Sequence, residues 1–247
     1  MTGKKPKIAL CLSGEPRSSM FCFPYIYETF LKETAYYDID VYIHSWKGFR
    51  ALDLYNPKKY RIEFINEPIF VNNIVKNINK LPTDLNTMFS VSETFTPNVN
   101  VFKNSLLMLS SIKKSFSLIE ESYDVYIRCR PDIFFRNKFW IVPILKDILN
   151  KKYDMFIPLN FAFKTTPNHY SDQIAIGTYS SMQLYSNLID NLNILISKTN
   201  KWNPEIWLKY WLDINNIKVS QHFIDHVLIR QSYVKTNLPD YNNFLDE

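Results

Sequence analysis

The sequence predicts a single α/β domain in which helices flank a central mixed, mostly parallel sheet. Short apolar runs alternate with amphipathic segments along the chain, as they do in successive β-α-β units. The 247 residues are 46% hydrophobic and 16% aromatic, which is enough to bury one sizeable core. No internal repeat or linker divides the chain, so one domain is expected over residues 1–247.

The first half of the chain has the order strand, helix, strand, strand. These elements are expected at residues 7–13, 24–33, 38–44 and 60–65. The short connections between the first three favour a parallel sheet. Residues 66–100 are rich in Asn, Thr and Pro, and they predict an irregular insertion with a short helix near 71–79.

The second half begins with the clearest helix of the sequence, over residues 101–121, where apolar residues recur every three or four positions. Strands are expected at 124–132, 153–159, 173–177 and 217–219, and helices at 180–197 and 204–212. Pro204 and Glu205 suit the first turn of the last helix. A loop is expected at 161–170, and a frayed terminus from residue 240 onward.

Composition excludes several classes of protein. The 29 Lys and Arg exceed the 24 Asp and Glu by only five charges, and no basic run is longer than two residues, so nucleic acid is not an expected partner. With 4 glycines there is neither a GxGxxG nor a GxxxxGK[ST] fingerprint. The three cysteines form no CxxC pair, and no apolar run could span a bilayer. We expect a cytoplasmic protein, with peripheral attachment to a membrane left open.

The first strand ends in a candidate ligand-binding turn, Ser13 to Arg17. Gly14 follows the strand directly, and ligands of open α/β sheets bind beyond the carboxyl ends of parallel strands. Arg17 could pair with a phosphate there. Gly48 and Gly177 also adjoin predicted strands, where a simple turn is the competing explanation.

The sharpest cluster of polar residues is Arg128, Arg130 and Asp132, at alternate positions of one predicted strand. Alternate residues share a face, so two arginines in an apolar run need anions beside them. Protein carboxylates could supply these anions, or a diphosphate or carboxylate ligand could. Pro131 ends regular pairing and leaves Asp132 at the strand tip, where a carboxylate can hold a divalent cation or a ribose hydroxyl.

Other polar candidates carry weaker signals. Asp172 precedes an apolar strand, and Glu205 begins a helix, which alone would explain a carboxylate at that position. His222 and His226 would share a face if their segment were helical, but a joint zinc site is less favoured than a single histidine that completes a metal or phosphate site. Trp202, Trp207 and Trp211 could stack on sugar rings, although packing in the core is the commoner fate of a pair four residues apart, such as Trp207 and Trp211.

Five segments in order along the chain resemble those of nucleotide-sugar-dependent glycosyltransferases with the GT-A fold, of the bacterial and large-virus type that acts in surface-polysaccharide synthesis. The segments are residues 8–17, 40–46, 123–132, 171–177 and 203–205. The resemblance implies a Rossmann-like GT-A domain, a nucleotide-sugar donor and a glycan or lipid-linked acceptor.

The resemblance also assigns roles to residues. It makes the loop from Ser13 through Gly14 to Arg17 the nucleotide-binding turn. It places Arg130-Pro131-Asp132 at the Asp-x-Asp motif, in which Asp132 would hold Mn²⁺ or Mg²⁺ on the sugar diphosphate. Arg130 stands where that motif has its first Asp. Together with Arg128 it could neutralise the charge of the diphosphate and so partly replace the cation.

On the acceptor side, the resemblance makes Asp172 or Glu205 the general base, and Asp172 is favoured because Glu205 has the helix-start explanation. Two alternatives stay open. The chain could be a non-catalytic nucleotide- or sugar-binding member of the same fold, because the first carboxylate of the motif is missing. It could also be a sugar nucleotidyltransferase, although the Ser13–Arg17 loop fits that class poorly.

Overall fold

The computed structural model has an α/β architecture built on a mixed sheet, as the sequence predicts. It describes residues 4–32, 35–64, 67–78, 99–137, 140–159 and 169–229. The strands are β1 (Lys7–Ser13), β2 (Asp38–Ser45), β3 (Lys59–Ile62), β4 (Val125–Cys129), β5 (Ile133–Phe135), β6 (Met155–Phe156), β7 (Ile174–Gly177), β8 (Val219–Ser220) and β9 (His226–Leu228). The helices are α1 (Ser19–Ile26), α2 (Leu52–Tyr55), α3 (Glu67–Val75), α5 (Val99–Phe116), α6 (Val142–Leu149), α7 (Tyr179–Ser186), α8 (Leu192–Thr199) and α9 (Pro204–Ile214).

The main sheet has seven described strands in the order β3-β2-β1-β4-β7-β6-β8. The first four are parallel, and β7 runs antiparallel to both β4 and β6. The chain builds outward from β1 to β2 and β3, and then returns to place β4 on the other side of β1. The strand order therefore reverses between β1 and β4, which is where open α/β sheets bind ligands.

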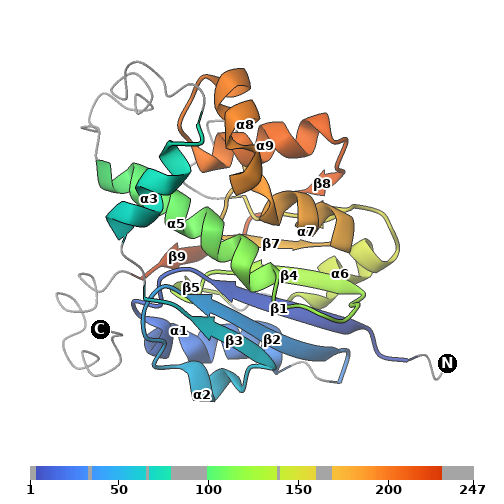
Figure 1. Ribbon diagram of the computed structural model, residues 1–247. Coiled ribbons are helices and arrows are strands. Elements are labelled where there is room, and N and C mark those ends of the chain that lie inside the picture. The colour runs from blue at the N-terminus through green and yellow to red at the C-terminus, as the bar shows by residue number, and fades with distance from the viewer. Residues whose placement is uncertain are drawn as a thin grey trace.

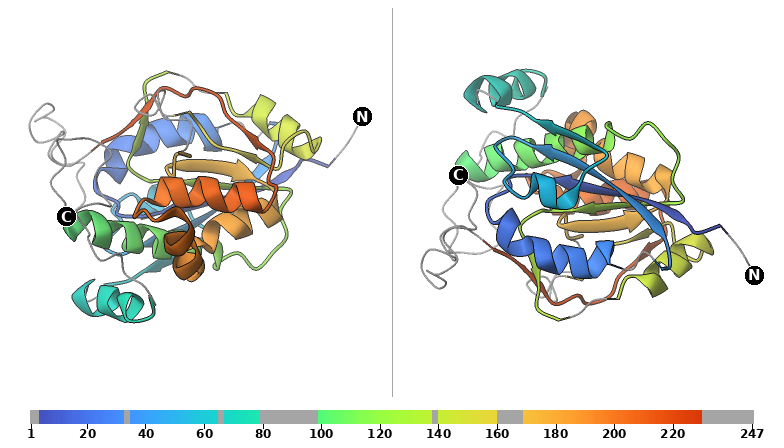
Figure 2. Two further views of the ribbon diagram at one scale, coloured as in Figure 1. Left: turned by 90° about the horizontal axis from the view of Figure 1, so that it is seen from above. Right: turned by 90° about the horizontal axis from the view of Figure 1, so that it is seen from below.

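Helices cover both faces of this sheet and divide the core in two (Figures 1 and 2). One face of β1 and β4 packs on α1 and α6, through residues such as Leu10, Ile127 and Ile148. The other face packs on α5, α7, α8 and α9, through residues such as Tyr126 and Trp207. β5 and β9 form a separate antiparallel pair beyond the end of β4.

Several element boundaries differ from the sequence prediction. The helix expected over 24–33 begins at Ser19 and carries Pro24 in its interior, and it continues as a π-helical segment over Tyr27–Leu31. A wider turn next to an internal proline accommodates the missing N–H. The helix expected over 180–197 is broken by a 3₁₀ turn, Leu188–Asn191, between α7 and α8.

The strand expected over 124–132 ends at Cys129, because Pro131 lies in a turn that redirects the chain into β5. Within β4 the predicted alternation is confirmed, since Val125, Ile127 and Cys129 share one core while Tyr126 belongs to the other.

Part of the expected insertion is regular, since residues 67–75 form α3. Its remainder, residues 79–98, lies outside the described part of the chain, as do most of the loop expected at 161–170 and the terminus from residue 240. Among the helices that the structure describes, none is long and apolar enough to cross a membrane.

Candidate functional site

The predicted site residues from distant parts of the chain meet at one edge of the sheet, where the parallel strands end. Ser13 closes β1 and Arg130 follows β4, while β1 and β4 pair side by side up to Leu12 and Cys129. Because β7 is antiparallel to β4, its first residue, Ile174, lies opposite Cys129, and Asp172 therefore reaches the same edge. This edge, at the reversal of strand order, is called the switch edge below.

Arg128 is the buried cation of the switch edge, and only 1% of its surface is exposed. Its Nε donates to Ser13 Oγ at 3.1 Å, and its Nη1 donates to the main-chain carbonyl oxygen of Asp172. Its Nη2 is buried and has no hydrogen-bond partner among the described residues. No described carboxylate forms a salt bridge with Arg128, and its hydrogen-bond acceptors among the described residues are two neutral oxygens.

Arg130 differs from Arg128 because a protein carboxylate satisfies it. Its Nε and Nη2 donate to the two carboxylate oxygens of Asp132, each at 2.9 Å. Burial disfavours the charged form of Arg130, but Asp132, with help from Asp172 and Glu15, raises the pKa of Arg130 above its usual range. The sequence left open whether protein carboxylates or an anionic ligand compensate the two arginines. Among the described residues, a protein carboxylate compensates Arg130 but not Arg128.

The loop after β1 adds further charges to the switch edge. Arg17 donates from Nε to Glu15 at 2.9 Å and approaches Asp132 with Nη1 at 3.4 Å. Lys47 donates to the other oxygen of Glu15 at 3.0 Å. Although burial opposes the charge on Glu15, Lys47 and Arg17 lower the pKa of this carboxyl. Gly14 has φ +126° with open space where a Cβ would stand, so the backbone conformation, and not crowding, requires glycine.

The two acidic candidates, Asp172 and Glu205, are electrostatic neighbours. Burial, followed by the negative charge of Asp172, raises the pKa of Glu205 well above its usual range, so the site favours the protonated form of Glu205. Asn203 caps α9 by accepting from the backbone N–H of Glu205 at 2.8 Å, which fixes the start of the helix. A buried carboxyl whose pKa is raised beside a second carboxyl is typical of acid-base sites.

His226 and Gln173 also belong to this cluster, although the sequence did not show that they meet. His226 lies in β9 and its Nε2 is 3.0 Å from the side-chain oxygen of Gln173. Its Nδ1 donates to the carbonyl oxygen of Ile224 at 2.9 Å, and burial lowers its pKa. The segment is extended and not helical, so His222 and His226 do not share a helix face. A joint zinc site of His222 and His226, which would need a shared helix face, is therefore not supported.

The expected divalent cation at Asp132 does not fit the described residues. Both oxygens of Asp132 accept from Arg130, and Arg17 adds a third contact from a cation. Within the described ranges there is no group of three or more His, Cys, Asp or Glu side chains that could hold a metal ion.

Two other candidates have packing explanations. A Cβ at Gly177 would lie 2.9 Å from the carbonyl oxygen of Asp154, and Gly177 is at the opposite edge of the sheet, beside Tyr126. Trp202 and Trp207 are 2% and 0% exposed and stack edge to face at 4.7 Å in the core. Neither tryptophan can present its ring to a sugar in this structure.

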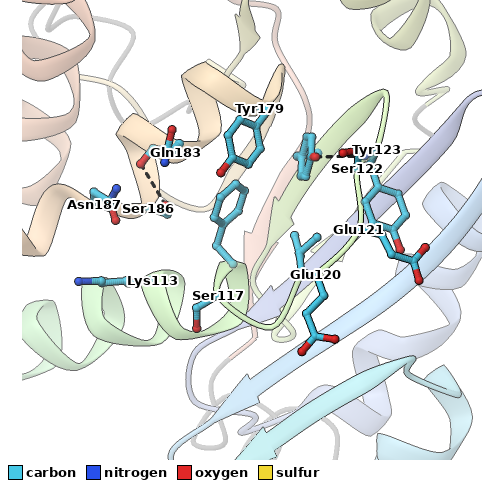
Figure 3. A pocket seen from close by; sticks show the side chains of 13 residues that line it. Lys113, Ser117, Glu120, Glu121, Ser122, Tyr123, Tyr179, Gln183, Ser186 and Asn187 are labelled. Carbon is cyan, nitrogen blue, oxygen red and sulfur yellow. Dashed lines mark hydrogen bonds between the residues drawn. The ribbon is translucent and has the colours of Figure 1, made fainter.

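The clearest cavities among the described residues lie away from the switch edge. One, of about 580 Å³, is formed between α5 and α7 near the start of β4 (Figure 3). Another, of about 490 Å³, is lined by residues of the π-helical segment, β2 and α2.

Fold and site together define an α/β protein with a buried, arginine-rich cluster at the reversal point of its sheet. No protein-family model and no curated protein matches the chain. Among solved structures 204 chains match, and one of these is the apo crystal structure of mouse xyloside xylosyltransferase 1. That match has 9% identity and a TM-score of 0.44, and it covers 97% of this chain and 92% of that one. So low a TM-score carries no argument about function.

Proposed function

We propose that this chain is a glycosyltransferase that moves a sugar from a nucleoside diphosphate sugar to a hydroxyl group of a glycan or lipid-linked acceptor. The observation that carries the proposal is Arg128, a buried guanidinium at the switch edge whose Nη2 has no hydrogen-bond partner, and whose charge has no carboxylate partner, in the described part of the chain. A buried cation without a counter-ion is costly, and an anionic ligand that reaches the strand ends would compensate it.

A diphosphate is the anion that this edge suits best. Arg128 supplies the buried charge. Arg17 and Lys47, from the loops after β1 and β2, share the single carboxylate of Glu15, so together these three residues leave one positive charge in excess. A departing nucleoside diphosphate gains negative charge as its bond to the sugar breaks, and fixed cations stabilise that charge in the transition state. That the diphosphate carries a sugar is inferred from the order of segments, which resembles that of GT-A glycosyltransferases.

Asp172 is the proposed general base. Burial and Asp172 raise the pKa of Glu205, so we assign Glu205 the role of hydrogen-bond donor and not that of the base that takes the proton of the acceptor hydroxyl. The main-chain carbonyl of Asp172 accepts from both Arg128 and Tyr185, which fixes the backbone that carries the base. Asp172 therefore takes the catalytic role, and Glu205 positions the sugar or the acceptor.

The proposed sugar transfer needs no reactant besides the donor and the acceptor. The acceptor oxygen forms a bond to the anomeric carbon, while the bond from that carbon to the diphosphate oxygen breaks. Its electron pair leaves with the nucleoside diphosphate, held by the arginines. The proton of the acceptor hydroxyl goes to Asp172.

Donor binding by this mechanism needs no added divalent cation, since arginine side chains occupy the carboxylate of Asp132. The test is thermal unfolding of the full chain with UDP, GDP, CMP and dTDP species, in Mn²⁺ and in EDTA. A ligand at 100 times its Kd stabilises the fold by about 2.7 kcal/mol. The proposal expects the nucleotide to raise the unfolding temperature equally in both buffers. If EDTA abolished the increase, a divalent cation held by Asp132 would be needed for binding, against the proposal.

Turnover separates the proposal from its alternatives. Slow release of nucleoside diphosphate from one sugar nucleotide supports a glycosyltransferase. Binding without turnover of any donor, with any acceptor mixture, supports a non-catalytic module of the same fold. Formation of a sugar nucleotide from a sugar phosphate and a nucleoside triphosphate would identify a nucleotidyltransferase.

A further inference from the structure

The cavity between α5 and α7 is separate from the switch edge. It lies beside Tyr126, near the start of β4, and the residues that line it come from α5, from the segment between α5 and β4, and from α7 (Figure 3). The switch-edge residues follow the other end of the same strand. The volume of about 580 Å³ lies within the range of small-molecule sites.

Three aromatic rings form one wall of this cavity. Phe116 lies 5.6 Å from Tyr126 and 5.8 Å from Tyr179, and the two tyrosine rings are 5.5 Å apart, measured between ring centroids. Tyr126 is buried at 2%, whereas Tyr179 is 52% exposed. The buried ring of Tyr126 and the partly buried ring of Phe116 pack against Tyr179, so the exposed aromatic surface of Tyr179 in the cavity lining is supported by two neighbouring rings.

Neutral hydrogen-bonding groups stand next to the aromatic wall. Tyr179, Gln183 and Asn187 follow one another at intervals of four residues, so they share one side of α7 and its end. The side-chain amides of Gln183 and Asn187 make no hydrogen bond with any residue that the structure describes. Each amide offers both donors and an acceptor to a ligand. Ser117 and Ser122 also line the cavity.

The charged residues at the rim are neutralised by partners on neighbouring elements. Lys113 donates to both oxygens of Asp190, at 2.7 and 2.6 Å. Glu120 pairs with Lys59, and Glu121 accepts from Lys58 at 2.9 Å. The cavity therefore offers no unpaired charge to an ionic ligand. An apolar ring face beside neutral amides and hydroxyls suits a ligand with an apolar C–H face and many hydroxyl groups.

We infer that the cavity between α5 and α7 binds a neutral saccharide unit. The sugar's C–H face stacks on Tyr179, and its hydroxyls exchange hydrogen bonds with Gln183 and Asn187. If the proposed function holds, this unit belongs to a part of the acceptor glycan remote from the reacting hydroxyl. Saccharide binding itself does not depend on that function.

The test uses the full chain and saturation-transfer difference NMR with maltose, cellobiose, lactose and N,N′-diacetylchitobiose as probes. At least one probe is expected to bind the wild-type chain. Tyr179→Ala is expected to weaken that binding about tenfold or more, because it removes the stacking surface, whereas Tyr179→Phe retains it. Gln183→Ala tests the amide separately, and the matched control is Tyr60→Ala, since Tyr60 is a similarly exposed tyrosine (57%) on β3.

Binding lost in Tyr179→Ala and Gln183→Ala but kept in Tyr179→Phe and Tyr60→Ala supports the inference. It is overturned if no probe binds the wild-type chain, or if binding survives both Tyr179→Ala and Gln183→Ala. Nucleotide-induced thermal shifts measured on the same variants keep the two proposals apart. Those shifts depend on the switch edge and are expected to be unchanged in every α7 variant.

Discussion

Arg128 and Asp172 are joined by a hydrogen bond from the guanidinium Nη1 to the main-chain carbonyl oxygen, across the antiparallel pair β4–β7. The same carbonyl also accepts from the Tyr185 hydroxyl at 2.9 Å. The arginine is thus not needed to satisfy that oxygen. Arg128 is buried next to Ser13, and its Nη2 has no hydrogen-bond partner among the described residues, which is the basis for the proposal that it serves a ligand.

Arg128→Met is therefore expected to change the free energy of unfolding by less than about 1 kcal/mol, since a buried charge is replaced by an apolar chain of similar length. The same change is expected to weaken nucleoside diphosphate binding about ten- to a hundredfold, because a charge-assisted hydrogen bond contributes about 1.5–3 kcal/mol. Urea unfolding and calorimetric titration with UDP and GDP measure the two effects.

The control for Arg128→Met is Arg136→Met, since Arg136 is 58% exposed and pairs with Asp225 at 3.7 Å. It should leave nucleotide affinity unchanged. A loss of stability in Arg128→Met without any loss of affinity would assign Arg128 a purely structural role and contradict the proposed site.

Asp132→Asn is expected to destabilise the fold by about 3–5 kcal/mol, because Asp132 is fully buried and its removal leaves Arg130 without a counter-ion. Urea unfolding of the two proteins measures the difference. Asp225→Asn is the matched control. It breaks the exposed pair with Arg136 and should cost less than about 1 kcal/mol. Equal costs in the two variants would show that the Arg130–Asp132 pair adds no particular stability.

The sequence was sufficient to predict strands at the positions of β1, β4 and β7, because apolar runs and their turn signals are local features. It placed Gly14 and Asp132 at the ends of two of these strands. It did not show that Asp172 reaches the same edge, because that depends on the antiparallel pairing of β7 with β4. What the sequence could not show is which arginine pairs with the carboxylate of Asp132. Arg130 and Asp132 are two residues apart, and on a continuous strand their side chains would run in parallel. The turn at Pro131 instead brings them into a two-bond ion pair.

Contacts between distant segments were also hidden from the sequence. The protonation of Glu205 depends on burial and on Asp172, which is 33 positions earlier in the chain, and no local pattern reports such a pair. His226 reaches Gln173 only because β9 pairs with β5 beyond the end of β4. Whether His222 and His226 share a face depended on a helix in this segment, and pairing with β5 makes residues 226–228 a strand.

Asp172→Asn is expected to lower the rate of sugar transfer about 10²- to 10⁴-fold, the range for loss of a general base, with little change in donor affinity. Initial rates of nucleoside diphosphate release, at saturating donor and acceptor, measure the effect. Asp213→Asn, at an exposed carboxylate on α9 that pairs with Lys209, is the control and should keep the wild-type rate. Full activity in Asp172→Asn would remove Asp172 from the reaction.

Glu205→Gln is expected to make the protein less sensitive to alkaline pH. The folded-state pKa of Glu205 is raised above its ordinary value of 4.5 by burial and by Asp172, so folding favours the protonated carboxyl. Its stabilising contribution is complete below the unfolded pKa and is lost as the pH rises through the folded pKa. Glutamine resembles the protonated acid and does not titrate. The wild-type chain should therefore lose stability relative to the variant above about pH 4.5, by at most about 1.4 kcal/mol per pH unit.

Urea unfolding of both proteins from pH 5 upward, in steps of about one unit, measures this difference. The matched control is Glu120→Gln, because the Glu120 side chain is 73% exposed and its stability curve should stay parallel to that of the wild type. If the curves for Glu205→Gln and the wild type were also parallel, Glu205 would be ionised in the folded protein. Glu205 could then also act as the general base, which would contradict the proposed roles of Asp172 as base and Glu205 as positioning residue.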